Sequence, residues 1–289
     1  MTQSATGPAP GRSSSPAAGT LYVVATPIGH LDDLSTRAVA VLRGVRAILC
    51  EDTRHSSTLL SHYGIARPLL SLHQHNERAR IEEALSLLRE GADLALISDA
   101  GTPLVSDPGF HLVAAARAAG LGVSPIPGAS ALIAALSVAG LPSDRFAFEG
   151  FLPAKASERQ RRLEGLSRDP RTLIFYEAPH RIGEVLDAAA ASFGADRPAV
   201  LARELTKRFE TILALPLGEL ASRVQADPDQ QRGEIVLLVA GAPELEDAAK
   251  LVEAQRVYRV LAAELPPSQA ARLTAAITGV PKRQVYGVE

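Results

Sequence analysis

The sequence predicts an α/β protein built from two α/β domains and a small C-terminal helical unit. Short apolar runs rich in β-branched residues alternate with segments whose apolar residues recur at helical spacing. Strands that alternate with helices in this way indicate a largely parallel sheet covered on both faces. The chain has 289 residues, of which 46% are hydrophobic and 21% charged, which suits two globular domains of ordinary size.

Four parts are expected along the chain. Residues 1–18 are rich in Ser, Pro, Ala and Gly and lack the apolar core of a signal peptide, so they predict a disordered tail. The first α/β domain is expected over residues 19–132 and the second over 133–243. Residues 244–289 carry alternating charged and apolar residues and predict a helical extension.

The first domain shows five strand-like runs, each followed by a helical pattern. The expected strands lie within residues 20–27, 46–52, 68–76 and 94–97 and in a short run that begins at 122. The expected helices cover residues 34–45, 53–64, 77–91 and 110–120 and the apolar segment that ends near 140. Glycines at 64, 91 and 120 mark three helix ends.

The second domain repeats the alternation. Its expected strands lie within residues 146–153, 171–179, 198–205, 210–216 and 233–241, and its expected helices within 157–167, 180–194 and 217–225. Residues 266–286 have the rhythm of a helix-turn-helix, with Gly279, Val280 and Pro281 in the turn. A small helical packing unit is the favoured interpretation of this segment, and a base-reading module is the alternative.

The stretch "LALISDAGTPLVSDPG", residues 94–109, joins an apolar strand to a loop that bears acids and small residues. Open α/β sheets build small-molecule sites from such loops at the carboxyl ends of their strands. Gly101 allows a ligand to approach the backbone closely. Asp99 and Asp107 are therefore candidate ligand-binding residues, with turn or helix-cap roles as the alternative.

Composition and missing motifs exclude several classes of protein. The single cysteine, Cys50, ends an apolar run and is expected to be buried filler, which fits a reducing cytoplasm. The dinucleotide, triphosphate, zinc-protease and serine-hydrolase motifs are missing from the sequence. His73 and His75 could share a metal, but a hydrogen-bonding loop explains them as well, and no metal is expected. No membrane span is expected, because the most apolar window is short and broken by Gly and Pro.

A net charge of −2 gives no global attraction to nucleic acid, so any RNA contact must come from local patches. Residues 155–162 and 203–208 are two basic candidates, with an ordinary solvated face as the alternative for each. If all the strands are parallel, the loops that follow them meet at one edge of the molecule. The charged and polar residues expected to converge there are Arg54, Asn76, Glu77, Asp99, Glu177, His180 and Arg181.

Several of these motifs resemble one known family. The stretches "ATPIGHLDDLSTRA", "EDTRHSSTLL", "HNE", "SDAGTPLVSDPG", "PGASALIAALSVAGLPSDRFAFEGFLP", "FYEAPHRI" and "GEIVLLVAG", in this order, are similar to those of the ribosomal RNA small-subunit methyltransferase I family. That family belongs to the tetrapyrrole methylase, or class III methyltransferase, superfamily. The resemblance covers about residues 20–286 and departs at His30, where the family usually has Asn.

The resemblance implies two α/β domains of tetrapyrrole-methylase type, with S-adenosyl-L-methionine in the cleft between them. It also implies a cytoplasmic homodimer that methylates the 2′-hydroxyl of a cytidine in 16S ribosomal RNA, as free rRNA or within the small ribosomal subunit. The residues that it places beside the cofactor are Ile28, Gly29, Asp99, Ala100, Thr102, Ser130, Ala131, Tyr176, Ala202 and Ile235. An ionised Asp99 carboxylate suits this place, because it accepts hydrogen bonds from amino or hydroxyl groups.

The position of the loops suggests which residues act on the RNA. We hypothesise that His75, Asn76 or Glu77 orients or deprotonates the 2′-hydroxyl, while Arg54 and Arg181 hold phosphates. The alternative for His75 and Asn76 is that they tie loops together. Two other functions stay open on the sequence alone: methylation of a tetrapyrrole-like small molecule, and binding without catalysis.

Overall fold

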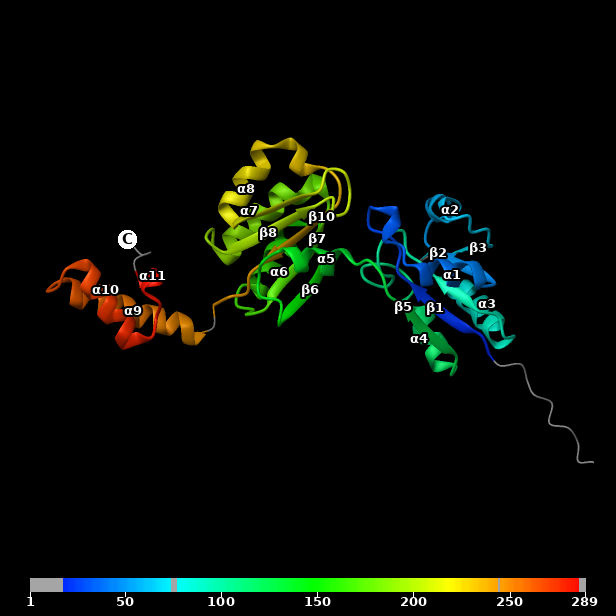
Figure 1. Ribbon diagram of the computed structural model, residues 1–289, viewed down its shortest axis with the longest axis horizontal. Coiled ribbons are helices and arrows are strands. Elements are labelled where there is room, and N and C mark those ends of the chain that lie inside the picture. The colour runs from blue at the N-terminus through cyan, green and yellow to red at the C-terminus, as the bar shows by residue number, and fades with distance from the viewer. Residues whose placement is uncertain (1–17, 74–76, 244, 286–289) are drawn as a thin grey trace, which may run out of the picture.

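The computed structural model describes residues 18–73, 77–243 and 245–285 and contains two five-stranded sheets (Figure 1). The expected tail lies outside these residues, apart from its last residue. The α/β architecture with C-terminal helices is confirmed. The two sheets lie next to each other, and the C-terminal helices form a separate group beyond the second sheet (Figure 1).

The first sheet is parallel throughout, as the alternation of strands and helices predicts. Its strands are β1 (Thr20–Val24), β2 (Ala47–Cys50), β3 (Leu69–Ser71), β4 (Leu94–Leu96) and β5 (Gly122–Ile126), in the spatial order β3-β2-β4-β1-β5. The helices between them are α1 (Thr36–Gly44), α2 (Thr53–His62), α3 (Glu77–Arg89) and α4 (Phe110–Ala118), with the short 3₁₀ turn η1 (Leu31–Asp33) ahead of α1.

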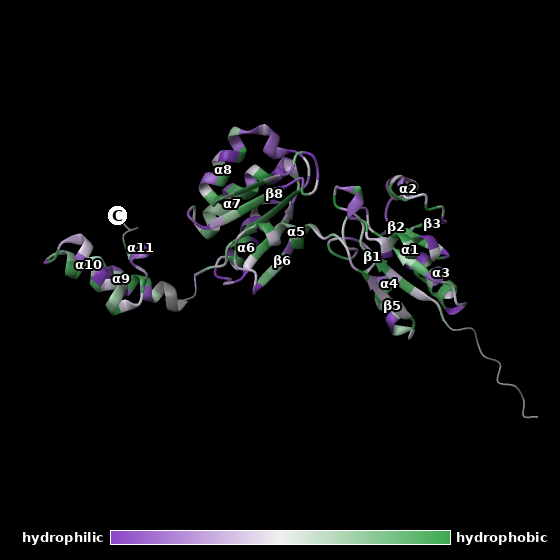
Figure 2. Ribbon diagram, viewed as in Figure 1, coloured by the Kyte–Doolittle hydropathy of each residue, from purple (hydrophilic) through white to green (hydrophobic). Residues whose placement is uncertain are grey.

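Helices cover both faces of this sheet because its strands are apolar on both sides. Leu49 and Leu96 pack with α3 and α4 in one cluster, whereas Ile48 and Ala95 pack with α1 and α2 in the other. Cys50 is buried in the second cluster, as expected, and burial raises the pKa of its thiol. Figure 2 shows mainly hydrophobic residues in the strands of the first sheet and more hydrophilic residues in the helices around it.

The second sheet is mixed, which corrects the expectation of a largely parallel sheet for this half of the chain. Its strands are β6 (Phe146–Phe151), β7 (Thr172–Glu177), β8 (Pro198–Arg203), β9 (Thr211–Pro216) and β10 (Ile235–Val239), in the order β6-β7-β10-β8-β9. Strands β6 and β7 are parallel, but β10 runs antiparallel to both β7 and β8, and β8 forms an antiparallel pair with β9. A fully buried strand is apolar whichever way it runs, so its composition does not reveal its direction.

The second sheet is also covered on both faces, and one face brings the two halves together. Its helices are α6 (Ala156–Leu166), α7 (Ile182–Phe193) and α8 (Leu217–Ala226), with 3₁₀ turns η2 (Pro179–Arg181) and η3 (Pro228–Gln231). These three helices pack on the face that carries Phe175 and Leu237. Helix α5 (Ala131–Val138), which follows the last strand of the first sheet, packs on the opposite face with Val236 and Leu238. Ile28, from the loop after β1, belongs to the same cluster, so that face is the junction between the halves.

The C-terminal residues form α9 (Leu245–Ala262), α10 (Pro267–Thr278) and α11 (Lys282–Val285). These helices pack on one another through a small cluster of their own that includes Ala254, Ala271 and Val280. Gly279 ends α10 in a left-handed conformation, and the turn leads directly into α11. The helix–turn–helix arrangement predicted for residues 266–286 is therefore present over the part that the structure describes.

Candidate active site

Three loops at the carboxyl ends of the first sheet are joined by hydrogen bonds. Thr26, after β1, forms an isolated antiparallel bridge with Gly101, after β4, in which the two backbone amides donate over 2.9 and 3.1 Å. The Thr102 hydroxyl donates to the carbonyl of Ala129, after β5, over 2.9 Å. Gly101 has φ 79°, and a Cβ there would lie 3.3 Å from Cγ2 of Ile28. A glycine therefore suits the point where the loop after β4 meets the loop after β1, which we call the first loop.

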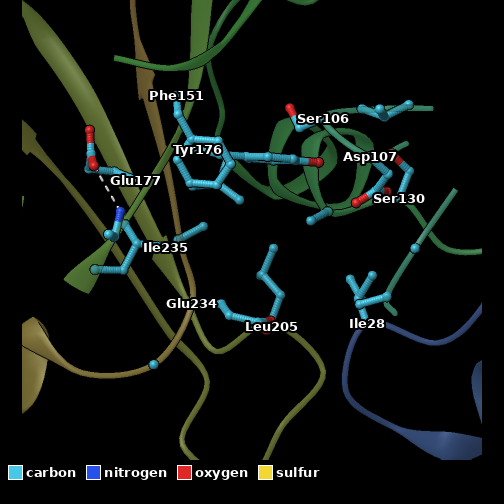
Figure 3. A pocket seen from close by; sticks show the side chains of 18 of the residues that line it. Ile28, Ser106, Asp107, Ser130, Phe151, Tyr176, Glu177, Leu205, Glu234 and Ile235 are labelled. Atoms are coloured by element: carbon cyan, nitrogen blue, oxygen red, sulfur yellow. Dashed lines mark hydrogen bonds between the residues drawn. The ribbon is translucent and has the colours of Figure 1, made fainter. Parts of the chain in front are cut away.

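A cleft of about 300 Å³ opens between these loops and the second sheet (Figure 3). The Tyr176 ring, from β7, forms one wall and packs edge-on against Phe148 and Phe151, with ring centroids 4.8 and 5.9 Å away. The Tyr176 hydroxyl accepts a hydrogen bond from the backbone amide of Leu132 over 3.1 Å, which ties this wall to the start of α5. The cleft is mainly apolar with few polar groups, as small-molecule sites usually are.

The structure gathers all ten residues expected to border the cofactor around this cleft and an adjoining one. Eight line the first cleft: Ile28, Ala100, Thr102, Ser130, Ala131, Tyr176, Ala202 and Ile235. The other two, Gly29 and Asp99, line the adjoining cleft of about 310 Å³, which shares Ile28, Ala100 and Glu234 with the first. These residues come from both halves of the chain, so the clefts exist only where the halves meet.

Asp99 fits a polar, cationic ligand. Its Oδ1 atom is buried and accepts no hydrogen bond from the described residues. A buried carboxylate oxygen without a donor is costly, because it has given up water without replacement. A ligand that brings an amino or hydroxyl group would remove this cost, and S-adenosylmethionine carries both.

A loop of the second half meets the first loop at the edge of the adjoining cleft. The backbone amide of His30 donates to the Thr206 hydroxyl over 3.0 Å. Lys207 lines the adjoining cleft and donates to Glu204 and Glu234 over 2.8 and 3.0 Å. Glu204 and Thr206 have φ of 52° and 63°, a left-handed backbone that side chains rarely adopt. The sequence marks residues 203–208 only as a basic segment and does not predict this contact with the first half, since no glycine signals the loop's left-handed conformation.

The residues expected to act on RNA are only partly brought together. His75 and Asn76 lie outside the described residues. Glu77 begins α3 and lines a further cleft of about 690 Å³. Arg54 has a side chain that is 90% exposed, pairs with Asp52 over 3.1 Å and lines none of the three clefts.

The arginine of the loop after β7 is bonded within the chain. Arg181 donates through Nη2 to the carbonyls of Leu152 and Pro153 over 2.7 and 3.0 Å, and its Nε lies 3.3 Å from the Glu177 carboxylate. Burial raises the pKa of Glu177, while its bond from the Ala178 amide and the Arg181 charge act in the opposite direction. The guanidinium of Arg181 therefore fixes this loop to the residues after β6, and the hypothesis that it also holds a phosphate stays a prediction.

The two basic segments are largely neutralised within the chain. Arg159 is buried and pairs with Glu184, Arg162 pairs with Glu149, and Lys155 pairs with Glu158. In the second segment, Arg203 is buried and bonded to Phe209 and Thr211. Within the part of the chain that the structure describes, Arg161, Arg203 and Arg208 are the cations of these segments without a salt bridge.

The 690 Å³ cleft contains residues that sequence analysis did not assign to catalysis. It is lined by Glu51, His73, Glu77, Ser106, Asp107, Pro108, Gly109, Phe110 and His111. Burial raises the pKa of Asp107 to about 6, helped by the nearby charges of Glu51 and Asp99 and opposed by the Ser98 hydroxyl. The sequence identifies Asp107 as either a ligand residue or a turn residue, and its position at this cleft depends on tertiary structure.

Among residues 18–73, 77–243 and 245–285, none of the helices has the length and apolar character needed to cross a membrane. The same residues contain no group of three or more His, Cys, Asp or Glu side chains that could hold a metal ion.

Comparison with known proteins identifies the family. The family model described as Tetrapyrrole (Corrin/Porphyrin) Methylases matches residues 20–221, and the one described as RsmI C-terminal HTH domain matches residues 248–288. The protein named Ribosomal RNA small subunit methyltransferase I of Pseudomonas aeruginosa is 60% identical over 271 residues, covering 93% of this chain and 96% of the relative. The protein of the same name from Xylella fastidiosa strain Temecula1 is 59% identical over 269 residues, covering 93% and 98%.

A solved structure shares the fold. Uroporphyrin-III C-methyl transferase from Thermus thermophilus, complexed with S-adenyl homocysteine, aligns with a TM-score of 0.53 at 18% identity, covering 77% of this chain and 97% of that one. Three observations indicate the same family: the motifs, the two-sheet architecture with its interfacial cleft, and the relatives that match nearly the whole chain. The chain belongs to the ribosomal RNA small subunit methyltransferase I family, within the tetrapyrrole methylases.

Proposed function

We propose that this chain transfers the methyl group of S-adenosylmethionine to the 2′-hydroxyl of a cytidine in small-subunit ribosomal RNA. The single observation that carries the proposal is the pair of adjoining clefts between the halves, where ten residues from both halves border the space for one small ligand. The relatives that match nearly the whole chain are named for methylation of small-subunit rRNA. The solved neighbour holds S-adenyl homocysteine, the demethylated form of the donor.

The chain's own residues would hold the cofactor by complementary contacts. The orphaned Oδ1 of Asp99 would accept a hydrogen bond from its ammonium or ribose hydroxyl groups. The apolar side chains of Ile28, Ala131 and Ile235 would cover the flat adenine ring, because they line the wall of the cleft. When bound, S-adenosylmethionine supplies a methyl group on a positively charged sulfur.

Positioning is the main contribution that the protein makes to this displacement. Alignment of the attacking oxygen with the methyl–sulfur bond can supply up to about 7–11 kcal/mol in favourable cases. Glu77 lines the 690 Å³ cleft, and we propose that it orients the ribose together with His75 and Asn76. Exposed Arg54, at the start of α2, would contact a phosphate of the RNA backbone.

The proposed assembly is a homodimer in the cytoplasm, where ribosomal RNA is modified. Strand β9 is an edge of the second sheet, and Ile212 within it and Phe209 just before it are exposed apolar residues. Exposed apolar side chains at a sheet edge favour a protein partner. Light scattering coupled to chromatography should give twice the chain mass of 30.4 kDa.

Labelled methyl transfer tests the function. The full chain is incubated with methyl-tritiated S-adenosylmethionine and, separately, small-subunit particles from a strain lacking this activity, naked small-subunit rRNA, and uroporphyrinogen III. Label recovered as 2′-O-methylcytidine after digestion to nucleosides is the expected result. Label in the tetrapyrrole alone, in a base methyl group, or in no acceptor would overturn the proposal.

A further inference from the structure

The cofactor cleft and the 690 Å³ cleft share part of their lining. Ser106 and Asp107 line both of them. In Figure 3 the Tyr176 ring points towards Ser130 and Asp107 on the first-half side of the cofactor cleft. Asp107 is the residue with a carboxyl group in this shared lining, and a carboxylate can accept a proton.

The backbone around Asp107 is held in an unusual conformation. Leu104 and Ser106 have φ of 73° and 67°, although neither is a glycine. Left-handed conformations of ordinary residues cost free energy and concentrate at functional sites. Here they turn the loop after Gly101 so that residues 106–107 reach both clefts.

The 690 Å³ cleft is suited to a nucleotide swung out of an RNA strand. Its volume lies in the range of small-molecule sites. Phe110 lines it with 67% of its surface exposed, which offers a flat apolar face for a base. Sequence-specific RNA recognition commonly uses splayed bases stacked on aromatic side chains. The carboxylates of Glu51 and Glu77 in the same lining can accept hydrogen bonds from an exocyclic amino group such as that of cytosine.

The charged and titratable groups around Asp107 come from several elements. Those that act on its charge or share its clefts are Glu51 after β2, His73 after β3, Glu77 of α3, Asp99 after β4, His111 of α4, and Tyr176 and Glu177 of β7, with Glu234 before β10. Burial is the largest influence and raises the pKa of Asp107 to about 6. A carboxylate with this pKa is a stronger base than an ordinary one and is still ionised at neutral pH.

We propose that Asp107 is the general base of the methyl transfer, acting on a nucleotide held in the 690 Å³ cleft. This inference rests on the proposed function. The ribose 2′-oxygen forms its bond to the methyl carbon while the carbon–sulfur bond breaks and its electron pair goes to sulfur. The hydroxyl proton passes to the Asp107 carboxylate, which later releases it to water. Glu77 then orients the substrate and need not accept the proton.

The Asp107→Asn variant tests this role because it keeps the shape of the side chain and removes the base. We expect kcat to fall by about 10²–10⁴-fold. The Kd for S-adenosylmethionine, measured by calorimetry, should change by less than about tenfold, because Asp107 lines the cofactor cleft but its proton transfer affects only the chemical step. The matched control is Asp187→Asn, an exposed position on α7 outside the three clefts, which should retain the wild-type kcat.

Two pH measurements complete the test. In the wild type, kcat/KM should fall as pH falls through about 6, because protonated Asp107 cannot accept a proton. The Asp107→Glu variant should have a lower kcat/KM but keep this fall at acid pH, which we call the acid limb. NMR gives a readout that does not depend on activity. The ¹³C carboxyl resonance of Asp107 is identified by its absence from the spectrum of Asp107→Asn, and in the full wild-type chain it should titrate near pH 6.

Wild-type turnover in Asp107→Asn, with the acid limb intact, would overturn the inference. If the Asn variant does not fold, the pH dependence of kcat/KM still decides. A wild-type kcat/KM that does not fall at acid pH overturns the inference, and a fall whose midpoint shifts in Asp107→Glu supports it. Failure of the proposed function has a different signature, because the wild type would then transfer no methyl group to RNA at all.

Discussion

At the scale of single residues, Asp99 carries the strongest link between structure and ligand. Its buried Oδ1 has no donor among the described residues, although the surrounding loops are joined by hydrogen bonds. Folded proteins seldom leave such an atom unsatisfied unless a ligand completes it. The folded chain therefore tolerates a local cost that binding removes.

Replacing Asp99 with Asn should weaken S-adenosylmethionine binding more than it weakens the fold. A hydrogen bond to a charged group is worth about 1.5–3 kcal/mol, so Kd should rise roughly 10- to 100-fold. The free energy of unfolding should change by less than about 1 kcal/mol, because Oδ1 has no partner to lose. Calorimetry and urea unfolding measure the two quantities, with exposed Asp144→Asn as the control. An unchanged Kd would remove Asp99 from the site.

At the scale of elements, the contact between the first loop and residues 204–207 holds the adjoining cleft closed. Gly29 lies so close to this loop that a Cβ would stand 2.5 Å from Cγ of Lys207, 2.6 Å from Oγ1 of Thr206 and 2.9 Å from the Leu205 carbonyl oxygen. Distances this short force one of the two loops to move. The glycine thus sets how closely the halves approach at this edge.

The variant Gly29→Ala should separate these loops and raise the Kd for S-adenosylmethionine by at least about tenfold, since a displacement of even 1 Å at a binding site is costly. Gly44→Ala is the matched control, because a Cβ at Gly44, the last residue of α1, meets nothing within 4 Å. Calorimetry on both variants gives the comparison. Equal affinities would show that the first loop and residues 204–207 do not control the site.

The sequence predicts the elements better than it predicts their directions. Apolar periodicity and glycine helix ends mark the first half well enough to give a parallel sheet. In the second half, β10 is apolar throughout and antiparallel to both neighbours, a direction that its residues do not encode. The order of strands there is decided by tertiary packing.

The same limit applies to the site. Residues expected from the motifs, such as Ile28 and Tyr176, do lie together at the cleft. The sequence gives Asp107 only as a ligand or turn residue and residues 203–208 only as a basic segment. Left-handed backbone at Ser106 and Thr206 shapes both loops, and no glycine marks those turns. The bonds from Arg181 to the Leu152 and Pro153 carbonyls could not be predicted, because these partners are distant in sequence.

At the scale of the whole molecule, the chain is two interlocked halves and a helical group with its own small core. The halves share one apolar cluster that contains Ile28, α5 and the second sheet, whereas α9, α10 and α11 pack mainly on one another. Binding of the donor should therefore depend on both halves and not on the C-terminal helices.

A chain ended after residue 243 should keep the wild-type Kd for S-adenosylmethionine to within about twofold, since none of the described residues 245–285 lines the three clefts. It should also gain about 2.7 kcal/mol of stability at a ligand concentration 100 times Kd. Calorimetry and thermal unfolding with and without the donor measure these effects. Loss of binding on truncation would mean that the helical group supports the cleft.

The location of the donor tests the central claim most directly: the two halves close around it and present its methyl group to an RNA ribose. A crystal structure of the full chain with bound S-adenosylmethionine is the measurement. The account predicts density in the cleft between the two sheets, against Asp99 and Tyr176, with the methyl group on the side of Ser106 and Asp107. Density outside this cleft, or a methyl group directed away from Asp107, would contradict it.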